Sequence, residues 1–131
     1  MPKAKGTFHV TAWDEKTYEE LSGQAKLTRA HIDQDYDGDL RGRGTWDLLM
    51  CYRDDGTAVF TGFGKFEGEA AGHKGAFVME NRGTFDGQKA RSTLTVVTDS
   101  GTGRLKGVSG KGRSVAPHGP DGSYTFDLAG A

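Results

Sequence analysis

A five-residue pattern that begins and ends in glycine constrains the fold of this chain more than any other feature. It reads glycine, a polar residue, leucine or phenylalanine, a charged residue and glycine. It occurs four times, as Gly38–Gly42, Gly64–Gly68, Gly83–Gly87 and Gly103–Gly107. Two glycines four residues apart would each cost a helix about 1 kcal/mol, whereas in a strand they share one face with the apolar residue between them. We therefore expect these pentads to be strand or hairpin elements.

Around the pentads, apolar and polar residues alternate with the period of a strand that has one buried face. The longest such run has an apolar face made of Leu40, Gly42, Gly44, Trp46, Leu48, Met50 and Tyr52. The spacing from Gly64 to Gly83 and from Gly83 to Gly103 fits two strands and a turn. We count eight strands. The register stays open in 58–68 and 103–115, and Val108–Gly112 suggests a bulge.

Only Asp14–Leu21 has a helical pattern, as a short turn that Asp14 could cap and Gly23 could end. Without a large helix to cover a sheet, eight strands with one apolar face must stack as a sandwich or close on themselves. The 21 glycines favour closure, because they permit the tight curvature of a small barrel. We predict an all-β chain in which residues 1–131 form a single closed eight-stranded antiparallel barrel with little helix.

Charge and composition exclude several classes of function. The 17 Lys and Arg nearly balance the 18 Asp and Glu, so the chain lacks the basic excess typical of nucleic-acid or membrane-surface binding. No run approaches the roughly 18 apolar residues of a membrane span, and the start lacks a secretory signal, so we expect a cytoplasmic protein. Cys51 is the only cysteine, which excludes an internal disulfide and a multi-cysteine zinc site.

Two patterns bear on metals and cofactors. One segment matches the first positions of a calcium-binding loop, with Asp33, Asp35, Asp37 and Gly38. However, Gly44 occupies the position where such a loop needs a bidentate glutamate. We interpret the aspartates as the solvated side of a strand, with cation binding left open. The four histidines show no ligand spacing, and no phosphate-binding or nucleophile-elbow motif occurs. We therefore predict no metal and no cofactor.

The segment Ser100–Gly112 resembles the glycine hairpin of allene oxide cyclase and dirigent barrels. The segments Gly6–Glu15, Leu48–Tyr52 and Gly83–Gly87 resemble a bacterial family of unknown function that is built as allene-oxide-cyclase-like barrels. The resemblance implies an eight-stranded barrel with a cavity, and a homo-oligomer formed through outer walls. It implies no assigned reaction, and the polar catalytic residues of the plant cyclases do not map onto this sequence position by position.

The apolar faces combine aromatic rings, methionines and a few polar tips, a mixture typical of small-molecule pockets. Several glycines and alanines on the same faces would leave room for a ligand unless aromatic rings fold over them. The predicted ligand-binding residues are Gln34, Trp46, Met50, Phe60, Phe77, Met79, Tyr124 and Phe126. The candidates for polarising a substrate oxygen are Tyr36, Tyr52 and Asn81.

Three functions are compatible with a barrel of this kind. The first is an isomerase or cyclase that folds a reactive apolar substrate, polyketide-like or lipid-like, into one conformer. The second is a non-catalytic carrier or sensor of a small hydrophobic molecule. The third is a structural oligomeric barrel whose lumen is filled by its own side chains.

Overall fold

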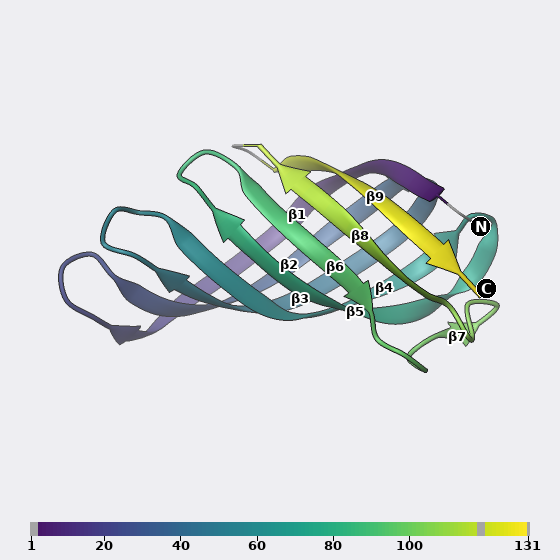
Figure 1. The fold of residues 1–131 in the computed structure, drawn as a ribbon, viewed down its shortest axis with the longest axis horizontal. Coiled ribbons are helices and arrows are strands. Elements are labelled where there is room, and N and C mark those ends of the chain that lie inside the picture. The colour runs from purple at the N-terminus through teal and green to yellow at the C-terminus, as the bar shows by residue number, and fades with distance from the viewer. Residues whose placement is uncertain (1–2, 118–119, 131) are drawn as a thin grey trace.

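Eight antiparallel strands close into a barrel, as predicted (Figure 1). The computed structural model describes residues 3–117 and 120–130. Around the ring the strands are β1 (Lys3–Glu20), β2 (Lys26–Gly38), β3 (Leu40–Tyr52), β4 (Ala58–Ala70), β5 (His73–Phe85), β6 (Ala90–Val96), β8 (Ser109–Ala116) and β9 (Asp121–Ala129), and β9 returns to β1. The two-residue strand β7 (Thr102–Gly103) pairs with β5 outside the ring. The described part of the chain contains no helix that is long and apolar enough to cross a bilayer.

Strand β1 continues to Glu20, so the helical turn predicted at Asp14–Leu21 is wrong. Residues up to Glu20 pair with β2, ending at Glu20 opposite Lys26, and this long-range pairing outweighs the weak local capping signal. Strand β9 covers β1 only from Lys3 to His9. Beyond that point no described strand pairs with this side of β1, whereas β2 pairs with β3 as far as Lys26 opposite Tyr52. The tip of the β1–β2 hairpin lies at the left of Figure 1.

The bulges also differ from the expected one. The ladder between β8 and β9 runs without a register shift from Ser109 to Val115, where a bulge at Val108–Gly112 was expected. Instead β1 carries two register shifts, between Val10 and Ala12 and between Thr17 and Glu19. The first shift changes which residues of β1 share a face, so that after it Trp13 and Glu15 stand opposite the inward-facing Ile32 and Ala30.

Aromatic rings fill the lumen by lying over glycines of the neighbouring strand. Four cross-strand pairs share this arrangement: Trp46 with Gly64, Phe60 with Gly83, Phe126 with Gly112, and Phe8 with Gly122. In each pair a Cβ atom on the glycine would clash with the ring. The small residues on the inner face therefore make room mainly for rings of the protein itself.

Three of the four pentads lie in strands or hairpins, as predicted, and the fourth does not. Gly103–Gly107 forms a turn after β7 that buries Leu105 completely. Gly75 of β5 lies under this turn, because a Cβ there would clash with the Thr102 carbonyl and would lie 3.1 Å from Leu105 Cβ. The turn therefore helps to close this end of the barrel.

A buried tyrosine ties β9 to the hairpin between β2 and β3. The Tyr124 hydroxyl donates to the Asp37 carbonyl over 2.7 Å and accepts from the Leu40 amide over 2.8 Å. Gly6 and Gly38 flank the hydroxyl, where a side chain on Gly6 would collide with it. This contact joins elements 84 residues apart in the sequence.

We predict that Tyr124→Phe lowers the free energy of unfolding by about 1–3 kcal/mol, because the buried Leu40 amide and the partly buried Asp37 carbonyl lose their partner. Urea denaturation measures the change. Tyr18→Phe on the exposed outer side of β1 is the matched control and should stay within about 0.5 kcal/mol of wild type. Equal losses in the two variants would contradict the role of the Tyr124 hydroxyl.

Candidate ligand-binding site

A cavity of about 100 Å³ remains in the filled lumen, between the rings and one mouth of the barrel. Apolar side chains from β1, β2, β3 and β4 form much of its wall, among them Phe8, Ile32, Trp46, Leu48 and Phe60. Its polar lining comes from Gln34, Tyr36, Asn81, Ser92 and Ser114. Trp13, which is 52% exposed, lies at its outer side.

The predicted site residues divide into two groups. Those that line the cavity are Gln34, Tyr36, Trp46, Phe60, Asn81 and Tyr124. Those that do not are Met50, Tyr52, Phe77, Met79 and Phe126. Phe77 and Met79 are completely buried, and Phe77 packs against Phe66 with ring centroids 5.4 Å apart. Alternation therefore assigned these side chains to the inner face correctly, but it could not separate packed positions from positions next to open space.

Three residues of the cavity lining already form hydrogen bonds with one another. The Tyr36 hydroxyl donates to Gln34 Oε1 over 2.9 Å. Trp46 Nε1 donates to the same oxygen over 3.1 Å and lies 3.3 Å from the Tyr36 hydroxyl. Burial raises the pKa of Tyr36 well above its ordinary value, so the phenol stays protonated at neutral pH. This group fixes the shape of one cavity wall and carries no charge.

Asn81 brings to the cavity a fully buried acceptor that lacks a partner. Its side chain is 6% exposed, and its Oδ1 atom has no hydrogen-bond partner among the described residues. A buried acceptor without a partner costs about 1–3 kcal/mol. Asn81 Oδ1 can therefore accept a hydrogen bond from a molecule in the cavity and recover this cost.

A carboxylate that sequence reasoning did not select lies at the mouth beside the cavity. Glu15 Oε2 accepts from the Tyr52 hydroxyl over 2.7 Å and from Thr28 Oγ1 over 2.6 Å. Glu15 Oε1 accepts from Trp13 Nε1 over 2.9 Å. The register shift in β1 turns Trp13 and Glu15 inward, and a simple alternation along the strand does not reveal it.

Hydrogen bonds fix the protonation states of Glu15 and Tyr52 at the mouth. Burial by itself raises the pKa of Glu15. The hydrogen bonds from Thr28, Tyr52 and Trp13 lower it by more than burial raises it, so the net pKa lies below the ordinary glutamate value. Burial and the bond to Glu15 raise the pKa of Tyr52. At neutral pH Glu15 is therefore an anion and Tyr52 a neutral donor. Tyr52 and Glu15 line an outer recess of about 580 Å³ and not the inner cavity wall that Asn81 shares.

The candidate metal ligands do not converge. Asp33, Asp35 and Asp37 lie along strand β2, opposite in direction to the buried Ile32 and Tyr36, which matches their interpretation as the solvated side of a strand. His9 pairs with Asp121 and His31 with Asp47, at 2.6 and 3.0 Å. Residues 3–117 and 120–130 contain no group of three potential ligands that could hold a metal. His118 lies outside the described residues.

Comparison with known proteins identifies the family. No curated protein matches the chain. A crystal structure of a protein of unknown function from the DUF3224 family of Shewanella oneidensis MR-1 is 26% identical, with a TM-score of 0.83 over 100% of this chain and 98% of that chain. The family model described as "Protein of unknown function (DUF3224)" matches residues 4–128. The chain therefore belongs to the DUF3224 family.

Proposed function

We propose that this barrel binds a small, mostly apolar molecule in its lumen and holds it by one hydrogen bond to Asn81. The unpartnered Asn81 Oδ1 atom carries the proposal. It is an acceptor, so the bound molecule presents a hydroxyl or N–H donor to it. The rest of the wall is mainly aromatic and aliphatic and favours an apolar body.

The size of the cavity limits the ligand. Its volume of about 100 Å³ is below the 300–1,000 Å³ typical of drug-sized ligands. It is closer to the roughly 150 Å³ space that accepts a single benzene ring in another protein. A compact ring fits this volume better than the polyketide-like or lipid-like substrate expected from the sequence.

Binding draws more support from the geometry than cyclisation does. The hydroxyl of Tyr36 is committed to Gln34, and the hydroxyl of Tyr52 to Glu15 in the outer recess. Of the three polar candidates, Asn81 alone offers an unused atom to the cavity. An amide oxygen can orient a guest but is a poor general acid or base at neutral pH. A carrier or sensor is therefore the form of the function that we favour.

Glu15 controls access in this proposal. Trp13 lines the cavity from its outer side, and its indole N–H is held by Glu15, which Thr28 and Tyr52 hold in turn. A ligand that passes this mouth must displace the Trp13 ring. The hydrogen bond to an ionised carboxylate is stronger than one to a neutral group, so it keeps the ring in place.

The polarity of the site can be tested with pyrrole and furan, two rings of similar size that differ in one N–H donor. We predict that wild type binds pyrrole roughly tenfold more tightly than furan, because only pyrrole satisfies Asn81 Oδ1. In Asn81→Leu the preference should disappear. Ligand-observed NMR titration measures both affinities, and Gln24→Leu on an exposed turn is the control. A pyrrole preference that persists in Asn81→Leu would argue against the site.

If Glu15 controls access to the cavity, removing its carboxylate should change the rate at which a ligand associates. Glu15→Ala should speed the association of pyrrole by roughly tenfold, because Trp13 loses a charge-assisted hydrogen bond. Exchange broadening in NMR measures the rate. Glu19→Ala, on the exposed end of the same strand, should leave it unchanged. Equal rates in wild type and Glu15→Ala would rule out Trp13 as a barrier.

The same contact predicts a pH dependence. Because the folded-state pKa of Glu15 is lowered, its stabilising effect is complete above the ordinary glutamate pKa of about 4.3 and is lost as the pH falls through the folded value. Acidification through the lowered folded-state pKa of Glu15 should therefore bring the association rate of wild type toward that of Glu15→Ala.

A further inference from the structure

A shallow groove of about 1,020 Å³ crosses the outer wall of the barrel, from Tyr18 and Leu27 on the β1–β2 hairpin to Arg113 and Val115 on β8. Most of the residues along it alternate with buried residues of the same strands, so their side chains point away from the lumen. The linings of this groove and of the inner cavity share Phe60, Ser92 and Ser114, whereas Asn81 lines only the inner cavity. The groove has two chemically different halves.

One half is apolar and centres on Leu49 of β3, which is 51% exposed. Cys51, two residues along, stands between Leu27 of β2 and Val59 of β4 in the ladder. Val59 is 37% exposed, and Tyr18 of β1 is 58% exposed. Exposed apolar side chains gathered on one face mark a binding surface more often than single ones do.

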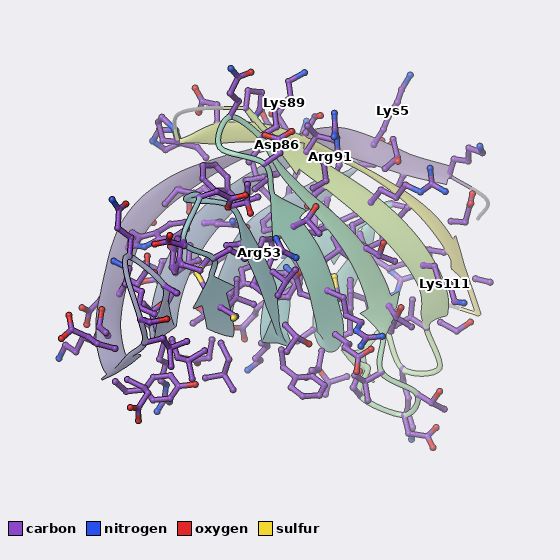
Figure 2. All side chains as sticks on the ribbon, turned by 60° about the vertical axis from the view of Figure 1, so that its left-hand side comes forward. Lys5, Arg53, Asp86, Lys89, Arg91 and Lys111 are labelled. Atoms are coloured by element: carbon purple, nitrogen blue, oxygen red, sulfur yellow. The ribbon has the colours of Figure 1, made fainter. Side chains whose placement is uncertain are left out.

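The other half is cationic. Arg82 of β5, Thr93 of β6 and Arg113 of β8 stand in one row across three neighbouring strands. Arg91 lies two residues from Thr93 on β6, and Figure 2 shows it close to Asp86 of the turn that precedes β6. Asp86 lies 3.8 Å from Arg91. Within the described part of the chain, neither Arg82 nor Arg113 has an acidic partner within 4.0 Å.

We propose that this groove binds a free amphiphilic anion, with its carboxylate or phosphate head on Arg82 and Arg113 and its alkyl chain over Leu49 and Val59. Guanidinium groups suit such heads because their donors match the oxygens in pairs. Strands lie about 4.8 Å apart, so Arg82 on β5 is about 14 Å from strand β2 across the wall. An alkyl chain of medium length spans that distance.

The groove suits an amphiphile better than a nucleic acid or another polyanion. A polyanion needs cations along its whole length, whereas the cations here occupy one half and the chain as a whole is nearly neutral. The apolar half would remain uncovered in such a complex. An anion with an alkyl tail covers both halves at once.

Dodecanoate below its micelle-forming concentration is the probe, and amide NMR shifts of the full chain report the site. We expect saturable shifts at Leu49, Val59, Arg82 and Arg113, and none there with acetate or with the neutral amphiphile dodecyl maltoside. Arg82→Gln/Arg113→Gln should weaken dodecanoate binding by roughly tenfold or more. Both side chains are exposed, so the fold should persist.

Arg41→Gln/Arg43→Gln removes the same charge from exposed positions of β3 and should leave binding unchanged. Unaltered affinity in Arg82→Gln/Arg113→Gln would overturn the proposal. So would shifts confined to the residues of the inner cavity, because dodecanoate would then occupy the lumen. Light scattering could instead reveal a dimer that does not bind dodecanoate and that dissociates in the Leu49→Asp variant. That result would overturn the proposal, because a second copy of the chain would then occupy the groove.

Discussion

The packing of aromatic rings on glycines is the interaction on which this barrel depends. An eight-stranded barrel has an interior just wide enough for its own side chains. Rings such as Trp46 fit only because the opposing residue, here Gly64, has no Cβ. The same pairing recurs at β4–β5, β8–β9 and β1–β9, so it acts at half of the strand pairs of the ring. The glycines that permit closure therefore also determine how much of the lumen stays empty.

The cavity and its mouth follow from two departures from this regular packing. Asn81 and the small side chains of Ser92 and Ser114 line part of the wall where no ring fills the space, and they leave about 100 Å³. The register shift after Val10 turns Trp13 and Glu15 toward the mouth. Local irregularities in an otherwise regular barrel thus produce both features of the site. One is the polar wall with the unpartnered Asn81 Oδ1 atom, and the other is the Trp13 ring held by the Glu15 carboxylate.

Period-two alternation predicted the strands and the inward direction of Trp46, Asn81 and Tyr124, and the glycine content favoured a closed barrel over a sandwich. Alternation could not identify the cavity, because Phe77 and Phe60 share the same pattern although only Phe60 borders open space. It also missed Glu15, since a bulge reverses the faces of β1 and leaves no local signature. The turn at Gly103–Gly107 repeats the pentad but lies outside the barrel ladder, where its role is to bury Leu105. The space left between packed side chains and the position of a bulge depend on tertiary contacts, and the pattern of one chain does not encode them plainly.

Electron density inside the barrel tests the ligand site most directly. The protein would be purified from its native lysate without denaturation, crystallised, and the extracted small molecules identified by mass spectrometry. The proposed binding function predicts density larger than a water molecule between Trp13 and Trp46, with a donor atom within about 3 Å of Asn81 Oδ1. A lumen closed by side chains alone, with Asn81 hydrogen-bonded to the protein, would contradict it.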